Sequence, residues 1–286
     1  MAIALGPNRY GKAEVRLVRV FRDGDTHSLA DLTVSVALSG DLEATHLTGD
    51  NSGVLPTDTM KNTVYAFAKE YGVGEPEQFA LLLARHFVST QSQVHGAKIT
   101  VAAYGWERLG PHSFRRQGSH TRTCVVTVAD AGVQVVSGLT GLVLLNSTAS
   151  EFHGYPKDRY TTLPETTDRI LATAVDAKWR HLSDQTDFAG SFAGVLGALT
   201  DAFVNTYSYS LQQTLFSMGS RVLESRPEVA EIRLELPNKH HYLVDLAPFG
   251  MTNRNEVFIA GDRPYGLIEG TVTRDDVPPA GAEWYL

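Results

Sequence analysis

The chain has 286 residues, of which 43% are hydrophobic, so it is long enough for one large domain or two ordinary ones with an apolar core. Its formal net charge of −7 argues against a nucleic-acid or anionic-membrane partner, because either would need a basic surface. A small anionic ligand is compatible with this net charge, since a pocket can be locally positive inside an acidic protein. The single cysteine, Cys124, excludes a disulfide within the chain and fits a reducing compartment.

Neither end of the sequence carries a targeting signal. The apolar stretch before Gly6-Pro7 is too short for a signal peptide, and the last four residues, Glu283 to Leu286, are not a peroxisomal Ser-Lys-Leu ending. We also expect no bilayer-spanning segment, and therefore a cytoplasmic location.

Hydrophobic periodicity predicts strands and helices in the first part of the chain. Apolar residues alternate between Leu32 and Leu38, which is typical of a half-buried strand, and Asp23-Gly24-Asp25 predicts a hairpin turn before them. The expected elements are strands at 14–21 and 32–38, helices from Thr57 to Tyr71 and from Pro76 to Val88, and strands at 98–108 and 121–128.

The second part of the chain is predicted to repeat this order. The expected elements are two short strands within 133–148, a helix over 165–179, a long helix over 191–223, and strands at 231–236, 241–246 and 256–260. The segment TDTMKNTVYAFAK from Thr57 can be laid over TTDRILATAVDAK from Thr166 without a gap. The pattern favours an α+β architecture used twice, in units 1–132 and 133–286, with antiparallel sheets covered by helices on one face. Exposed sheet edges then lead us to expect an oligomer.

Common catalytic and metal-binding motifs are missing from the sequence. There is no phosphate-binding loop, no GxSxG, no HExxH and no CxxC, so zinc has no support. On a strand, His240 and His241 would point to opposite faces and could not grip one metal. His86 is expected to be a packed or half-exposed helix residue and Cys124 a buried small hydrophobe.

Five segments distributed along the whole chain carry a family resemblance. They are NRYGKAEVR at 8–16, DNSGVLPTDTMKNT at 50–63, EFHGYPKDRYTTLPETTDRIL at 151–171, YSYSLQQTLF at 207–216 and LPNKHHYL at 236–243. In this order and spacing they resemble the urate oxidase (uricase) family. The resemblance implies a tunnelling fold, with two ββααββ units per chain whose sheets form a barrel in a homotetramer. It also implies active sites at subunit interfaces, with no metal, flavin or other cofactor.

The resemblance implies a substrate clamp on one subunit. Urate is a flat anion, and the planar fork of Arg169 can donate two parallel hydrogen bonds to one of its edges. The amide of Gln212 would hold the opposite edge, and the ring of Phe152 would stack on the purine. From the residues alone, Arg169 could be a surface helix residue, Gln213 would serve as well as Gln212, and Phe152 could belong to the core.

The resemblance also implies further wall and relay residues. Leu163 and Leu211 match apolar wall positions, although the family often has valine where Leu211 stands. Asn238 matches a residue near the place of O2 and water, and from sequence alone it could equally be a turn residue after Pro237. His240 would complete a proton relay, because histidine passes protons near neutral pH.

Lys12 and Thr57 match the family's catalytic pair, contributed by the facing subunit. A threonine hydroxyl is too weak an acid to relay a proton unaided, and a lysine can accept that proton where burial disfavours its ammonium form. Thr57 lies at a predicted helix start, where Thr57 and Asp58 could bind an anion through their backbone N–H groups. The simpler interpretations are a solvated lysine and an N-cap threonine.

These assignments predict oxidation of urate by O2 and water to 5-hydroxyisourate with release of hydrogen peroxide. Two alternatives remain at this stage. One is another tunnelling-fold enzyme acting on a pterin-like or purine-like ring, which would typically use a histidine-bound zinc or a catalytic cysteine. The other is a non-enzymatic purine-binding protein, which would be expected to lack Lys12, Thr57 and His240.

Overall fold

The computed structural model describes residues 3–278 and 280, and the predicted C-terminal ending therefore lies outside the described residues. Close packing divides the chain into two compact units. The first comprises residues 1–139 and 180–189, and the second comprises 140–179 and 190–286. Apart from several short additional elements, the order ββααββ occurs twice along the chain, which confirms the predicted α+β class.

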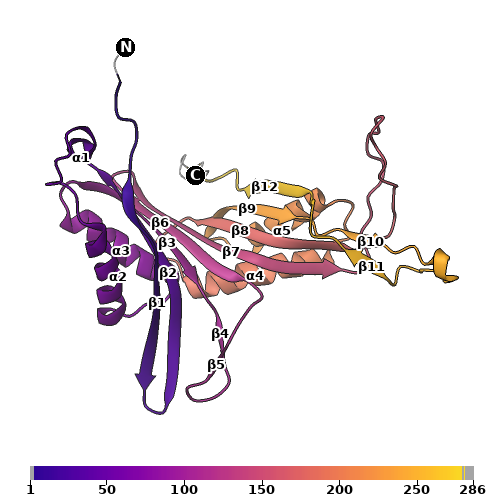
Figure 1. Ribbon diagram of the computed structural model, residues 1–286, viewed down its shortest axis with the longest axis horizontal. Coiled ribbons are helices and arrows are strands. Elements are labelled where there is room, and N and C mark those ends of the chain that lie inside the picture. Colours follow the sequence, from indigo (N-terminus) through magenta and orange to yellow (C-terminus); the bar gives the residue numbers. More distant parts are fainter. Residues whose placement is uncertain (1–2, 279, 281–286) are drawn as a thin grey trace. The chain divides into compact units, whose positions relative to one another are not determined.

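The first unit is a sheet covered by two helices on one face (Figure 1). Its strands run in the order β1-β2-β3-β6-β7, and the pairs β1–β2, β2–β3 and β3–β6 are antiparallel. The core is apolar and includes Val34, Leu38, Phe79, Ile99 and Val126, all of them at most 1% exposed. The elements are β1 (Tyr10–Asp23), β2 (Thr26–Gly40), α1 (Glu43–Leu47), α2 (Thr57–Glu70), α3 (Pro76–Thr90), β3 (Val94–Ala103), β4 (Trp106–Arg108), β5 (Phe114–Arg116) and β6 (Thr121–Ala129).

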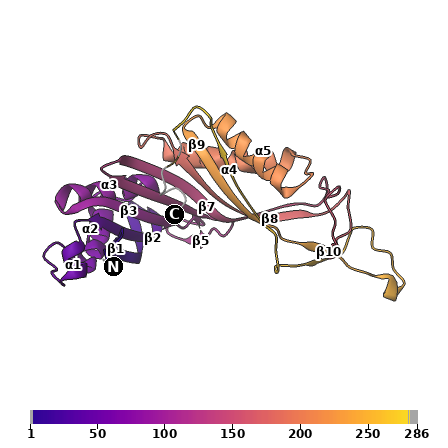
Figure 2. The same cartoon turned by 90° about the horizontal axis from the view of Figure 1, so that it is seen from above.

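The second unit repeats this plan, with helices lying along one face of its strands (Figure 2). Its strands run in the order β7-β8-β9-β12, and β9–β12 is antiparallel. Helix α5 approaches the sheet closely at Gly219, where an added Cβ would lie 2.5 Å from the Val272 side chain. The elements are β7 (Gly132–Asn146), β8 (Leu171–His181), α4 (Phe188–Asn205), α5 (Leu211–Ser225), β9 (Val229–Pro237), β10 (His241–Leu243), a 3-10 turn (Ala247–Phe249), β11 (Phe258–Ala260) and β12 (Leu267–Thr273); β7, β8 and α4 also contribute residues to the first unit.

The predicted helix over 165–179 is wrong. Residues 165–170 form a loop, and Leu171–His181 is strand β8. Thr173, Val175, Ala177 and Trp179 are all fully buried or nearly so, and this spacing of two is the period of a strand. The alignment of the Thr57 and Thr166 segments therefore does not describe equivalent elements.

Other element boundaries also differ from the prediction. The long helix over 191–223 is two helices, because residues 206–210 are non-helical and Ser210 caps the second helix. The two short strands predicted within 133–148 are one long strand, β7, which ends at Asn146, and the Gly141 N–H donates to Asp176 Oδ1 at 2.7 Å. Residues 98–108 belong to two strands, β3 and β4.

Helix α4 is the one helix in the described part of the chain that is long and apolar enough, by length and composition, to cross a membrane. Its mean hydropathy is 1.2. One side of it is buried, with Val195, Leu199 and Phe203 at most 2% exposed. A core helix of a soluble protein has the same properties, so α4 carries little weight for a membrane location.

Candidate active site

Lys12 is placed by an irregularity at the start of β1. It pairs with Val36 of β2, and the register shifts between Lys12 and Val15. Glu14, inside this β-bulge, has a φ of 55° and its N–H donates to Ser35 Oγ at 2.9 Å. Gly11 is required here, because an added Cβ would lie 1.8 Å from the Val36 carbonyl oxygen. Bulges commonly redirect a side chain, and this one sets the direction of a half-buried Lys12.

Thr57 and Asp58 are the first two residues of α2. Pro56 precedes them at the N-cap and provides no side-chain cap. The first N–H groups of a helix have no partner inside it, and the helix dipole makes this end positive. Thr57 is half-buried and Asp58 exposed. The arrangement leaves the Thr57 and Asp58 N–H groups suited to binding an anion.

The segments that carry Lys12 and Thr57 are joined directly. The Tyr10 hydroxyl, two residues before Lys12, donates to the carbonyl of Leu55, two residues before Thr57, at 3.1 Å. Asp58 accepts hydrogen bonds from Lys61 at 2.5 Å and from Asn62 at 3.0 Å. These contacts, with Lys61 the largest cause and the charge of Lys12 a smaller one, lower the pKa of Asp58. The first unit therefore brings Lys12, Thr57 and Asp58 into one neighbourhood.

The second unit contains a cavity of about 510 Å³ that collects five of the predicted substrate and relay residues. Those residues are Phe152, Leu163, Arg169, Asn238 and His240. They come from the loop before β8 and from the segment between β9 and β10, which are far apart in sequence. The volume lies in the range of small-molecule sites.

Arg169 lies in a loop rather than on a helix, directly before β8. Its main-chain N–H donates to the Ser150 carbonyl at 2.9 Å, and its Nε donates to Ser150 Oγ at 3.2 Å. Burial lowers the pKa of Arg169, and no neighbouring carboxylate offsets this effect within the described residues. A half-buried guanidinium without a counter-ion is suited to an anionic ligand.

Phe152 is fixed by its backbone and by two neighbours. It exchanges main-chain hydrogen bonds with Thr166, at 2.8 and 3.1 Å. Its ring lies 4.9 Å from the ring of Tyr155 at an interplanar angle of 17°, and the Arg169 Cζ lies 5.2 Å from its centroid. The ring is therefore a half-buried cavity residue rather than part of the core, and a flat ligand could stack on it.

Asn238 and His240 follow the end of β9. The Asn238 N–H donates to the Gly266 carbonyl at 2.8 Å, and the Gly266 N–H donates to His240 Nε2 at 3.4 Å. His240 precedes β10, so the alternation of a strand does not apply to it. Both His240 and His241 border the cavity.

At the start of α5, the two neighbouring glutamines have different contacts. Gln213 takes part in the capping of this helix, since its N–H donates to Oγ of the N-cap residue Ser210 at 3.2 Å and its Oε1 accepts from the Tyr209 N–H at 3.0 Å. Gln212 is exposed and forms no side-chain hydrogen bond within residues 3–278. Leu211 is 3% exposed, and neither Leu211 nor Gln212 lines the cavity within one chain. Their roles stay predictions.

The cavity also contains residues that the sequence did not single out. Thr166 and Asp168 lie inside the segment of family resemblance at 151–171, whereas Asn255 and Phe258 lie outside all five such segments. The pairing of β10 with β11 brings Phe258 to the wall, and Asn255 Nδ2 donates to Asp168 Oδ2 at 3.2 Å. The sequence predicts a strand at 256–260 but contains no local signal that assigns Asn255 or Phe258 to a site.

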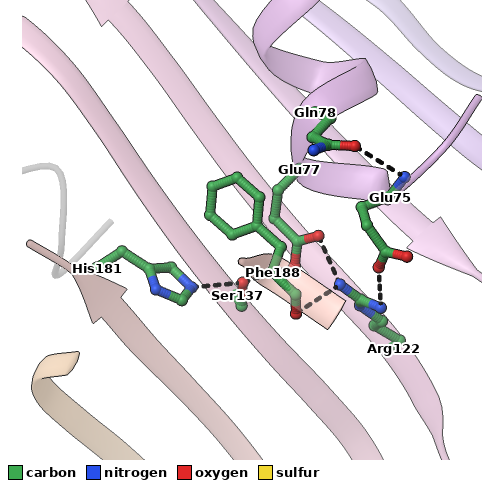
Figure 3. Close-up of polar contacts among 7 residues, drawn as sticks. All are labelled: Glu75, Glu77, Gln78, Arg122, Ser137, His181 and Phe188. Atoms are coloured by element: carbon green, nitrogen blue, oxygen red, sulfur yellow. Dashed lines mark hydrogen bonds and ion pairs between the residues drawn. The ribbon is translucent and has the colours of Figure 1, made fainter. Parts of the chain in front are cut away.

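A second polar cluster in the first unit has the residue types of a hydrolase triad (Figure 3). Ser137 Oγ donates to Glu77 Oε1 at 2.6 Å and lies 2.8 Å from His181 Nε2. Since the hydroxyl has one proton, His181 must donate to Ser137, which is the wrong direction for a general base. Glu77 is fully buried and also pairs with Arg122 at 2.7 Å. We assign this cluster to the stability of the fold.

Metal-ligand groupings are absent from the described part of the chain, in which no three His, Cys, Asp or Glu residues gather as a metal would require. Cys124 is 1% exposed, as expected, and burial raises the pKa of its thiol well above the ordinary value. His86 is half-buried, with its pKa lowered by burial. Neither residue has the setting of a nucleophile or a ligand.

Comparison with known proteins identifies the family. A family model described as Uricase matches residues 8–127 and 135–269. The uricase of Arthrobacter globiformis is 50% identical over 275 residues, which cover 96% of this chain and 91% of that protein. The uricase of Dictyostelium discoideum is 38% identical over 276 residues, covering 93% of this chain and 96% of that protein.

Solved structures agree with these sequence matches. The crystal structure of the Arthrobacter globiformis uricase has a TM-score of 0.97 at 49% identity over 100% of both chains. That of a Bacillus fastidious uricase has a TM-score of 0.82 at 23% identity over 95% of each chain, which shows the shared fold. The family model spans all five recognised segments as well as the residues of the cavity, and the chain therefore belongs to the uricase family.

Proposed function

We propose that this protein oxidises urate with O2 and water to 5-hydroxyisourate, releasing hydrogen peroxide. The observation that carries the proposal is the cavity that joins Arg169, Phe152, Asn238 and His240 in a chain half identical to a uricase. The reaction balances as one urate, one O2 and one water giving one 5-hydroxyisourate and one H2O2. Two electrons and two protons pass to O2 in this reaction, and the hydroxyl of water is added to the ring.

Arg169 and Phe152 would bind the urate anion. The guanidinium has no counter-ion among the described residues, so it keeps its donors for the edge of the purine. The Phe152 ring would cover the purine face, a contact worth about 0.5–1.5 kcal/mol beyond area burial. Gln212, with its side chain free at the start of α5, would hold the other edge. Leu163 and Leu211 would provide apolar walls.

Lys12, Thr57 and His240 would move the protons. The Thr57 and Asp58 N–H groups would orient the anion at the helix start, and Lys12 would take the proton that urate loses through the Thr57 hydroxyl. The more electron-rich urate can then reduce O2. Asn238 and His240 would hold O2 and afterwards the water that adds to the ring.

We propose that the complete site lies between two copies in a homotetramer. Lys12 and Thr57 belong to the first unit and the cavity to the second. The second unit also exposes large apolar side chains, including Tyr242 of the cavity at 52%, Phe249 at 70% and Ile259 at 58%. Exposed apolar side chains that lie close together are typical of protein interfaces. Assembly would also close the edges of the sheets into a barrel. We further propose a cytoplasmic location.

The decisive test follows the loss of urate absorbance in air and under nitrogen with the purified protein. We expect urate to disappear only in air, with hydrogen peroxide formed in equal amount. Urate consumption without oxygen, or no consumption in air, would contradict the proposed reaction. Because the residues fit chemistry without a cofactor, exhaustive dialysis against a chelator is expected to leave the rate unchanged.

A further inference from the structure

Tyr155 occupies a distinctive position behind the cavity. It is half-buried within a loop whose neighbours, residues 153–154 and 156–160, are all exposed. It does not line the cavity, yet it contacts two residues that do, Phe152 and Leu163. A residue with this placement can influence a ligand only through the side chains in front of it.

The ring of Tyr155 supports the ring of Phe152. The centroids are 4.9 Å apart and the planes differ by 17°, which is a stacked pair. Such pairs favour offset parallel packing and contribute beyond simple area burial. With one face covered in this way, the Phe152 ring has little freedom to turn about its side-chain bonds. The orientation of Phe152 is therefore set before a ligand arrives, which reduces the ordering cost of binding.

The hydroxyl of Tyr155 holds a second residue that lines the cavity. It donates to the carbonyl of Leu163 at 2.6 Å, across the loop. The loop is closed further by Lys157, whose Nζ lies 3.1 Å from Glu165 Oε1, and by the Gly154 N–H, which donates to the same oxygen at 3.2 Å. Lys157 Nζ also lies 5.6 Å from the centroid of the Tyr155 ring. One side chain thus links the stacking residue to an apolar wall residue.

We propose that Tyr155 is a positioning residue that sets the affinity for the purine ring by holding Phe152 and Leu163 in place. This inference rests on the proposed role of Phe152 in binding urate. Tyr155 does not touch the ligand, and it does not take part in proton transfer. Its effect should therefore appear in binding and not in the chemical steps.

The test measures urate binding under nitrogen and turnover in air for Tyr155→Leu. We expect the anaerobic Kd and the KM for urate to rise about 2- to 12-fold, the factor that corresponds to one aromatic pair. The value of kcat should stay within about twofold, because Lys12 and Thr57 are untouched. Tyr155→Phe keeps the ring and should restore most of the lost affinity, leaving only the smaller effect of the hydroxyl.

Tyr160→Leu is the matched control, since Tyr160 is in the same loop, is 72% exposed and contacts Arg159 rather than Phe152. Its Kd and kcat should equal those of the wild type. If Tyr155→Leu does not fold, Tyr155→Met fills similar volume without a ring and should show the same rise in Kd.

Unchanged urate affinity in the Leu or Met variant, with an active wild type, would overturn the proposal. A fall in kcat at constant Kd would also overturn the proposal, because that result indicates a loss of folded protein and no change in urate binding. An inactive wild type would instead contradict the proposed function itself.

Discussion

The side-chain amine of Lys12 is the group that takes up the proton of urate in our proposal. We expect Lys12→Met to lower kcat by about 100-fold or more, the usual contribution of a general base, while the anaerobic Kd for urate changes only a few-fold. Stopped-flow turnover and binding under nitrogen would measure the two quantities separately. Lys69→Met, which changes an exposed lysine of the same unit, should leave both unchanged. Equal losses in binding and turnover would assign Lys12 to binding instead.

Asp31 of β2 is a buried carboxylate on which several donors converge. It is 3% exposed and accepts from Trp106 Nε1 at 2.8 Å, and it pairs with Arg16 and, at 3.5 Å, with Arg116. Burial raises the pKa of Asp31, but the hydrogen bonds from Arg16 and Trp106 and the two positive charges outweigh it, so the pKa is lowered. Because the folded pKa lies below the unfolded one, the ionised group stabilises the fold above about pH 4. That contribution is lost as pH falls through the folded pKa.

We therefore expect Asp31→Asn to lower the free energy of unfolding by about 1–3 kcal/mol at pH 7, the cost of poorly satisfied buried donors. The difference from the wild type should shrink as the pH falls below about 4, because Asp31 is protonated first in the unfolded chain and, at lower pH, in the folded protein as well. Urea unfolding at both pH values measures it. Asp25→Asn, an exposed turn residue, serves as the control. A difference that does not change with pH would show that packing, not charge, accounts for the effect.

At the scale of elements, the start of α5 couples helix stability to the site. Ser210 Oγ caps the helix by accepting from the Gln213 N–H, directly beside Gln212. Ser210→Ala is expected to cost about 0.5–2 kcal/mol of stability and, by fraying this turn, to raise the KM for urate. Ser225→Ala at the other end of α5 should leave the KM unchanged, because its hydroxyl donates only to carbonyls of the last turn. If the two variants had similar KM values, the N-cap of α5 would not influence urate binding through Gln212.

Helices and strands with a clear hydrophobic period were predictable from the sequence, and those without such a period were not. Helix α2 follows from Met60, Val64 and Ala68, which recur at helical spacing and are all buried. Strand β8 was missed because its alternation becomes decisive only when both sides of the strand are known to be covered. The non-helical residues 206–210 between α4 and α5 were also missed, because apolar residues continue on both sides of them.

The site was predictable only in part, because some of its contacts depend on the fold and not on spacing in the sequence. Recognised segments supplied Phe152, Arg169, Asn238 and His240, and the fold brings these four to one cavity. Tyr155 lies inside such a segment, but its role depends on a ring contact that no spacing rule gives. The contribution of Asn255 depends on how β11 returns to β10, which sequence position alone does not determine.

At the scale of the whole molecule, a site shared between copies can be tested by mixing two inactive variants. Lys12→Met removes the proposed relay and Arg169→Gln the proposed clamp, so each homo-oligomer should be nearly inactive. When the two are co-expressed in equal amounts, a site built from two copies is intact only if the relay comes from one variant and the clamp from the other. Random assembly then restores about a quarter of the wild-type activity, because each half of the site is correct half of the time. Activity of the purified mixed oligomers, with subunit ratios measured by mass spectrometry, gives the result. Recovery is expected to be absent when the separately purified variants are mixed without subunit exchange. No recovery in the co-expressed sample, despite mixed oligomers, would mean that each chain builds its site from its own two units.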